Sequence, residues 1–457
     1  MNIIDYVGNH LTEVDFSTIT TVTPKSCNSF DELMNRWKEG MSVTQSLMDC
    51  AALCFAIHVS TKLDGDPLWS YLVGAPSSGK STLCELICAD EFNTKPLSKF
   101  TGLVSGSREG NHLVPAMQNK CVVIKDGTLL LESTPQQLAN VYGELRDIFD
   151  GSLEAHYRNG VEASFKNISF SMIIGITERV YALNMSALGE RFLHIRLETT
   201  RETEQSRNRN AIDSIFQDTK ITVAEGNEEG DSRSFPLQRQ FTAGFLAHLH
   251  ARLRNEDILR PSYTEQDKLL IQAVADVIAC SRASAPKDFK DEILYESRPE
   301  ASTRVVKQIA RVALGLCYVL GTKSITPEIR RLLVKMCHDT AFGRKFRIIR
   351  LIAIHEGISR AWMATKLDIP LQSCTNVLKD LMSMQVLEER AEETRKGPGR
   401  KNKLLFCPDW IRDSFRTVEN ASKNADNEDP VKKKATKRKP VKKKRPIKKK
   451  SPSPNQR

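Results

Sequence analysis

One stretch of the chain, GAPSSGKST (residues 74–82), combines residue types that bind a nucleoside triphosphate. It fits the pattern G-x-x-x-x-G-K-[ST], in which glycines permit a tight turn and backbone N–H groups face phosphates at a helix N-terminus. Lys80 would contact the β- and γ-phosphates, and the Ser81 hydroxyl would coordinate Mg²⁺. The sequence therefore predicts a site for ATP and Mg²⁺; the alternative is a Gly/Ser-rich surface turn. The predicted nucleotide-binding residues are Gly74, Ala75, Pro76, Ser77, Ser78, Gly79, Lys80, Ser81 and Thr82.

A phosphate loop also needs an acidic residue at the end of a nearby strand, to hold Mg²⁺ and its water. The segment CVVIKDG (121–127) ends an apolar run with Asp126, which we expect to be the second metal-binding residue. Many ATPases place a glutamate directly after this aspartate to polarise the attacking water, but Gly127 stands there. Slow ATP hydrolysis is therefore one expectation. The alternative is that Glu132 polarises the water in place of the missing glutamate.

The segment FSMIIGITERV (170–180) is a further apolar run that ends in polar residues. Thr177, at its end, would contact the γ-phosphate or the attacking water. The alternative is an ordinary strand end without a role in catalysis.

These residues must be positioned by a sheet, because short apolar runs alternate with helical stretches from Trp69 onward. This pattern predicts an α/β fold, a mostly parallel sheet with helices on both faces. The expected organisation is an N-terminal helical segment (1–65), a nucleotide-binding core (66–235), a helical lid (236–342), a winged helix-turn-helix domain (343–415) and a disordered Lys-rich tail (416–457). The N-terminal segment is either a separate domain or a helical preface to the core.

The order of these parts resembles an AAA+ ATPase of the branch that contains the minichromosome maintenance helicases and MoxR-type ATPases. The resemblance covers roughly residues 65–340 and consists of GAPSSGKS, VVIKD, the strand ending at Thr177, GERF and the helical lid. It implies a three-layer P-loop sandwich that assembles into a hexameric ring. The chain also resembles ATP-binding proteins of bacterial mobile elements. It departs from the branch at Gly127 and in lacking an asparagine where Thr177 stands.

The resemblance also implies two arginines that act on nucleotide. Arg191 in GERF would be the arginine finger of the adjacent subunit, with a structural salt bridge as the alternative, and such a finger is worth about 10³–10⁵ in rate. Arg304 would be the lid arginine. Residues 100–110 correspond to a pore or substrate loop, and residues 144–160 to a helix and hairpin. The implied catalytic set is Lys80, Asp126, Thr177, Arg191 and Arg304.

Residues 344–410 predict three short helices and two strands joined by a basic turn, the pattern of a winged helix. The second helix of the helix-turn-helix would expose side chains that reach bases in a major groove: Gln372, Ser373, Thr375, Asn376 and Lys379. The basic turn would contact phosphates through Arg395, Lys396, Arg400, Lys401 and Lys403. Many winged helices bind protein, which is the alternative.

The net charge of +11 is concentrated at the C-terminus. Residues 431–457 hold 14 Lys and Arg and no acid, so 11 minus 14 leaves −3 for residues 1–430. Such a tail predicts salt-sensitive affinity for nucleic acid, or alternatively a nuclear-import signal or a solubilising extension.

The cysteines, the apolar runs and the N-terminus indicate the cellular compartment of the protein. The 11 cysteines include no C-x-x-C pair, which predicts small core residues rather than a zinc site or disulfides. No apolar run is long enough to cross a bilayer and no signal peptide is apparent. We expect a cytoplasmic protein, nucleoid-associated in a bacterium or nuclear in a eukaryote.

The leading functional hypothesis is an AAA+ ATPase that acts on DNA as a helicase, loader or replication or recombination factor of a mobile element. The first alternative is a DNA-binding regulator controlled by nucleotide, with slow turnover. The second is a MoxR-like remodeller of protein partners.

Overall fold

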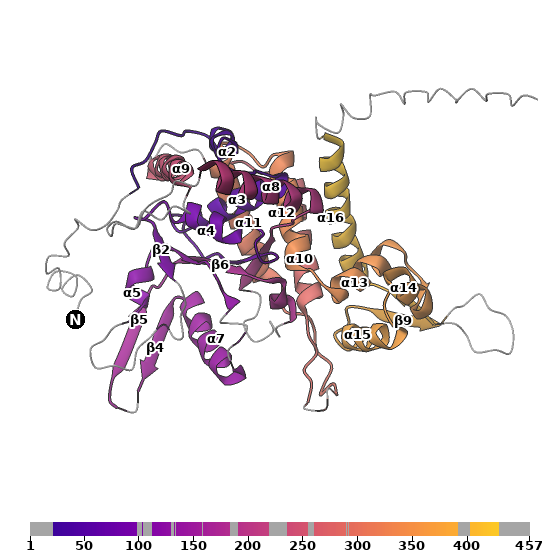
Figure 1. The fold of residues 1–457 in the computed structure, drawn as a ribbon. Helices are drawn as coiled ribbons and strands as arrows, with labels where there is room; N and C mark the ends of the chain where they lie inside the picture. The colour runs from indigo at the N-terminus through magenta and orange to yellow at the C-terminus, as the bar shows by residue number, and fades with distance from the viewer. Residues whose placement is uncertain are drawn as a thin grey trace, which may run out of the picture.

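The structure is a computed structural model of the 457-residue chain (Figure 1). It describes residues 22–97, 103, 112–128, 132, 134–157, 159–182, 191–218, 235–254, 260–288, 290, 292–391 and 403–428.

A five-stranded parallel sheet lies at the centre of the first half of the chain, in the order β2-β3-β6-β1-β7. Every residue of β1, β3 and β6 is buried, which explains why these strands read as continuous apolar runs. The parallel sheet confirms the predicted α/β fold. Its strands are β1 (Trp69–Val73), β2 (Thr94–Leu97), β3 (Cys121–Ile124), β6 (Ser171–Ile176) and β7 (Phe192–Arg196).

Helices cover both faces of the sheet, and alternate strand residues belong to two separate cores. Leu72 and Val123 join the core formed with α3, α4 and the C-terminal helices. Tyr71 and Val122 join the core formed with α5 and α7 (Figure 1). The α-helices described in this half of the chain are α2 (Phe30–Lys38), α3 (Gln45–Ser60), α4 (Lys80–Ile87), α5 (Val114–Met117), α7 (Pro135–Phe149), α8 (Arg201–Asp218) and α9 (Pro236–Arg254).

The N-terminal helices belong to the first of these cores. Helix α3 packs against the sheet and against α11 (Thr303–Val319). Helix α2 packs on α9, and the Trp37 indole N–H donates to Thr242 Oγ1 at 3.0 Å. In the part of the chain that the structure describes, the N-terminal helices are thus joined to the nucleotide-binding core.

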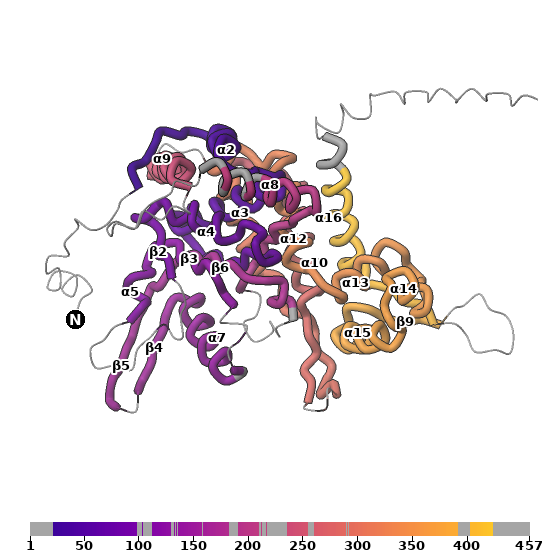
Figure 2. The backbone as a smooth tube through the Cα atoms, in the orientation of Figure 1, coloured from indigo at the N-terminus to yellow at the C-terminus, as the bar shows by residue number. Residues whose placement is uncertain are grey.

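A two-stranded hairpin, β4 (Ser152–His156) and β5 (Glu162–Lys166), lies between α7 and β6 along the chain. It extends away from the sheet on the side of α7 (Figure 2). Its outward side chains are exposed, because the hairpin has little protein to pack against.

The second half of the chain is mostly helical. Helices α10 (Glu265–Arg282), α11 and α12 (Pro327–Thr340) pack together, and the Thr326 side chain caps the N-terminus of α12. Helix α16 (Asp409–Glu428) packs on α10 and buries Phe415 and Val418. Residues 416–428, which were expected in the disordered tail, therefore belong to a helix held by apolar contacts. None of the helices described is long and apolar enough to span a membrane.

A smaller unit lies between α12 and α16. It contains a three-stranded antiparallel sheet of order β8-β10-β9. Ion pairs join it to the helices, including Lys287 Nζ–Asp380 Oδ1 at 3.1 Å and Arg350 Nε–Glu419 Oε1 at 2.6 Å. Its elements are α13 (Arg344–Ile354), β8 (Ile358–Ser359), α14 (Arg360–Leu367), α15 (Leu371–Ser383), β9 (Glu388–Ala391) and β10 (Lys403–Phe406).

Candidate functional site

The segment Gly74–Gly79 forms a tight loop between β1 and α4. Gly79 precedes α4 with φ +94°, a left-handed conformation that glycine adopts without strain. At Gly74 a Cβ atom would lie 2.8 Å from Ser78 Oγ, so the turn leaves no room for a side chain. The strand–loop–helix arrangement aims the first backbone N–H groups of α4 into the loop, as an anion site requires.

Lys80 is the first residue of α4 and its side chain folds back over the loop. Its ammonium group donates to Gly74 O at 2.8 Å and Ala75 O at 2.6 Å. Burial lowers the pKa of Lys80, while the nearby carboxylate of Asp126 acts in the opposite direction. Both acceptors are neutral carbonyls, so a phosphate anion would be the stronger partner. Ser81, the next residue, is exposed and open to a metal ion.

Asp126 follows β3 and is exposed. Its Oδ1 accepts hydrogen bonds from the Thr128 hydroxyl and from the Thr128 backbone N–H at 2.9 Å, and these bonds lower the pKa of the carboxyl. The carboxylate thus stays ionised at neutral pH, as Mg²⁺ coordination requires. Asp126 is close enough to Lys80 to shift the pKa of that ammonium group.

Gly127 has a structural reason for carrying no side chain. Its backbone N–H donates to Gly175 O on β6 at 2.7 Å. A Cβ atom at Gly127 would lie 2.6 Å from Ile174 Cγ2, closer than real contacts allow. A glutamate at this position would therefore clash with β6. The alternative carboxylate, Glu132, is exposed, and no contact places it at the site.

Thr177 follows β6, which lies between β1 and β3 in the sheet. The sheet thus puts Thr177 between the phosphate loop and Asp126, because parallel strands end at the same edge. Its hydroxyl oxygen is buried and has no hydrogen-bond partner among the described residues. A buried hydroxyl without a partner is unusual in a folded protein and is suited to a ligand.

Two charged residues at this edge were missed by sequence reasoning. Arg207 on α8 donates from Nη1 to Ser78 O at 2.7 Å, and burial lowers the pKa of its guanidinium group. No ion pair to Arg207 forms within the described ranges. Glu178 is near enough to raise the pKa of Lys80 and pairs with Arg196 at 2.9 Å. Neither belongs to a motif, so only tertiary structure reveals them.

Arg191 and Arg304 lie at the other edge of the sheet. Strands β1 and β7 are parallel, with Trp69 opposite Phe192, so Arg191 precedes the edge at which the strands begin. The five residues of β1, roughly 16 Å of strand, separate this edge from the phosphate loop. Arg304 is close by, since its charge acts with burial to lower the pKa of Arg191.

Each of these arginines has an acidic partner in its own chain. The buried Arg191 Nη2 lies 3.1 Å from Asp150 Oδ2, and its guanidinium lies 5.4 Å from the Phe149 ring centroid. Arg304 Nη1 lies 2.6 Å from Glu300 Oε1. The salt bridge that the sequence allowed as an alternative for Arg191 is thus present, and the finger role stays a prediction.

Some of the candidate DNA-contacting residues are among the described residues, and others lie outside them. On α15, Gln372, Asn376 and Lys379 are exposed, whereas Ser373 and Thr375 are half-buried. Lys403 pairs with Glu389 Oε2 at 2.9 Å. The predicted basic turn lies outside the described residues, which leaves out Arg395, Lys396, Arg400 and Lys401.

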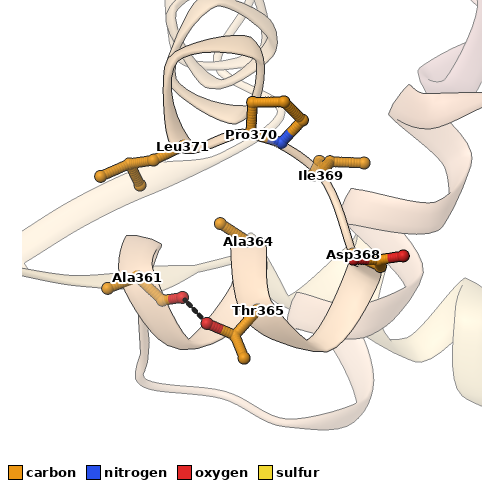
Figure 3. Close-up of a pocket in the computed structure, with 7 residues that line it drawn as sticks. All are labelled: Ala361, Ala364, Thr365, Asp368, Ile369, Pro370 and Leu371. Carbon is orange, nitrogen blue, oxygen red and sulfur yellow. Dashed lines mark hydrogen bonds between the residues drawn. The ribbon is translucent and has the colours of Figure 1, made fainter.

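A hollow of about 530 Å³ lies where α14 turns into α15 (Figure 3). Ala364, Ile369 and Leu371 line it, and the Thr365 hydroxyl turns back to donate to Ala361 O at 3.1 Å. The hollow belongs to the smaller unit and has no part in the phosphate loop.

Comparison with known proteins supports the nucleotide site. No protein-family model matches the chain. The adenylate kinase isoenzyme 6 homologue of Plasmodium falciparum (isolate 3D7) is 30% identical over 157 residues. The matched part is 34% of this chain and 77% of that protein. A stretch of this length is the size of one domain.

Proposed function

This chain belongs to the family of P-loop nucleotide-binding proteins that includes the adenylate kinase isoenzyme 6 homologue, and from that premise we propose a Mg²⁺-dependent AAA+ ATPase that acts on DNA as a ring. Lys80, Ser81 and Asp126 would hold MgATP, and Thr177 would contact the γ-phosphate or the attacking water. When bound, Mg²⁺ would neutralise charge on the phosphates.

The position of Arg191 and Arg304 carries the proposal. Both lie at the edge of the sheet opposite their own phosphate loop, too far to contact their own nucleotide. If they act on a nucleotide, it would be that of a neighbouring subunit, as in a ring ATPase, and this supports the proposal. The strand β6 between β1 and β3 supports the same class, because it brings Thr177 to the site.

Two further features support DNA as the substrate. The β4–β5 hairpin directly precedes β6 and extends from the core, at the position of the hairpin in the AAA+ ATPases that the sequence resembles. The smaller unit has the element order of a winged helix, with α15 as the second helix of the helix-turn-helix and the basic segment 392–402 between β9 and β10. The Lys-rich tail would add sequence-independent contacts to phosphate.

A mixing experiment tests the shared site. Lys80→Ala and Arg191→Gln proteins should each hydrolyse ATP poorly. Mixed rings should regain activity. Where the two variants adjoin in the right order, the Arg191→Gln subunit supplies Lys80 and the Lys80→Ala subunit supplies Arg191 to the same site. Two separate preparations of Arg191→Gln, mixed in the same way, are the control. Failure of the folded proteins to regain activity would contradict a site shared between subunits.

DNA dependence is tested separately, by steady-state ATP hydrolysis without DNA and with single- or double-stranded DNA at fixed low salt. If the protein is a motor or loader, single- or double-stranded DNA should strongly raise its rate of ATP hydrolysis. Tight ATP binding with negligible turnover in all three conditions would favour the nucleotide-controlled regulator. Hydrolysis that does not respond to DNA would favour the protein remodeller.

A second candidate is a phosphoryl transferase, since the matched relative is named as an adenylate kinase homologue. Incubation with ATP and AMP distinguishes the two. A kinase would convert both nucleotides to ADP at a rate set by AMP. The ATPase should release inorganic phosphate at a rate that AMP does not raise.

A further inference from the structure

Two histidines and an aspartate from separate segments converge in the core beyond the C-terminal end of α4. Asp90 Oδ2 lies 3.1 Å from His250 Nε2 and 3.6 Å from His58 Nε2. His58 comes from α3, His250 from α9, and Asp90 from the segment between α4 and β2. His58 is fully buried and His250 is 2% exposed.

Hydrogen bonding accounts for only part of this cluster. Although His250 Nε2 is near Asp90, it forms no hydrogen bond among the described residues, and Nδ1 of both rings also lacks a partner. His58 Nε2 makes one contact, at 3.4 Å from Thr94 Oγ1. Buried polar atoms are nearly always partnered, so several unpaired ring nitrogens in one place call for a ligand.

The spacing of the three side chains fits a metal ion. In a tetrahedral zinc site with bonds of about 2.0–2.1 Å, neighbouring ligand atoms lie roughly 3.4 Å apart. The 3.1 and 3.6 Å separations in the cluster lie on either side of this value. Two imidazole nitrogens with one carboxylate suit Zn²⁺, whereas Mg²⁺ and Ca²⁺ prefer oxygen ligands throughout.

The protonation states agree with this geometry. Burial lowers the pKa of His58 to about 3, so its ring is neutral at physiological pH. Although burial alone would raise the pKa of Asp90, His250, His58 and Asn93 together lower it. The Asn93 amide also donates to both Asp90 oxygens, at 3.1 and 3.0 Å, and fixes the carboxylate in place. Neutral imidazole and ionised carboxylate are the forms that bind metals.

We propose that His58, Asp90 and His250 bind one Zn²⁺ ion, with a water molecule or the Thr94 hydroxyl as fourth ligand. The ion joins α3, α9 and the α4–β2 segment. The eight residues of α4, about 12 Å of helix, separate it from the phosphate loop. It therefore stabilises the fold and takes no part in nucleotide chemistry.

Metal analysis of the full-length protein, purified without a histidine tag, tests the proposal. The protein should retain about one zinc per chain after dialysis. Treatment with a chelator followed by Zn²⁺ should raise Tm by about 5 °C, the order expected for a site filled well above its Kd. Mg²⁺ at the same concentration should give no such shift in the absence of nucleotide.

Matched variants locate the ion. Asp90→Asn and His250→Gln should lower zinc affinity at least 10-fold, whereas His248→Gln, on the same helix, should leave it unchanged. Zinc binding of equal affinity in Asp90→Asn would overturn the assignment. So would an unaltered protein that holds no zinc and gains no stability from it, and that result does not depend on any variant folding.

Discussion

The Lys80 ammonium group lies between two carbonyl oxygens of its own loop, a position that a nucleotide phosphate can take over. We expect Lys80→Ala to weaken ATP binding about 10- to 100-fold, since hydrogen bonds to charged groups contribute about 1.5–3 kcal/mol. Titration with a fluorescent ATP analogue measures the change. Lys125→Ala, which removes the exposed pair with Glu85, is the control. Unchanged affinity in Lys80→Ala would mean that nucleotide binds elsewhere.

Arg207 offers a second cation to the same phosphates. Because its guanidinium contacts Ser78 O and makes no ion pair within the described ranges, we expect it to turn to a bound triphosphate. Arg207→Ala should weaken ATP binding about 10-fold and ADP binding less. Isothermal titration with both nucleotides checks this, with the exposed Arg209→Ala as the control on α8. Equal losses for ATP and ADP would show that Arg207 only supports the loop.

His194 makes stability depend on pH. Both of its ring nitrogens are buried without a hydrogen-bond partner among the described residues, and burial holds its pKa well below the ordinary 6.5. The unfolded chain therefore binds the extra proton, so stability is full above about pH 6.5 and falls as the pH drops below it.

The slope for one such group approaches about 1.4 kcal/mol per pH unit. His194→Phe keeps the packing against Tyr71 and Tyr181 and should remove this part of the slope. Urea unfolding of both proteins at pH 7 and pH 5 measures the difference. If both proteins lose the same free energy of unfolding between pH 7 and pH 5, His194 is not the group responsible.

At the residue scale, the sequence predicts what is local. The residues from Gly74 to Thr82 form a contiguous motif, so their loop could be read directly. Arg207 is more than a hundred positions further on and reaches the loop only through the packing of α8. The histidines and aspartate at positions 58, 90 and 250 carry no spacing signal, because three separate elements bring them together.

At the scale of elements, strands were predictable because both faces of the sheet are buried. The position of β6 between β1 and β3 was not, because strand order depends on how connections cross the sheet. The polar composition of α16 concealed that helix. Its buried residues recur at helical spacing among charged ones, and they bind a partner surface on α10 that is distant in sequence.

Helix α16 should therefore contribute to stability. Ile411, Phe415 and Val418 are each at most 2% exposed, and burying such side chains contributes about 1.5–3 kcal/mol each. Deleting residues 409–457 should lower Tm by more than 5 °C. Deleting residues 429–457 should leave Tm unchanged. Calorimetry of both truncations checks this, and equal Tm values would mean that α16 adds no stability.

At the scale of the whole molecule, charge is divided between a nearly neutral body and a basic end. Residues 429–457 include 14 Lys and Arg, and each phosphate contact adds about 0.9 to the slope of log affinity against log salt. Deleting this segment should lower DNA affinity at low salt and flatten that slope. Fluorescence anisotropy between about 50 and 200 mM salt measures both. An unchanged slope would show that the tail does not touch DNA.

The close approach of β3 and β6 at Gly127 also limits how the proposed ATPase activity could change by mutation. A glutamate at 127 would clash with Ile174 before it could polarise a water molecule. Faster hydrolysis by that route would need a smaller residue at 174 first, and that substitution alone would only loosen the core. The benefit of each change would thus depend on the other, and this epistasis would prevent a gain in hydrolysis rate from a single substitution.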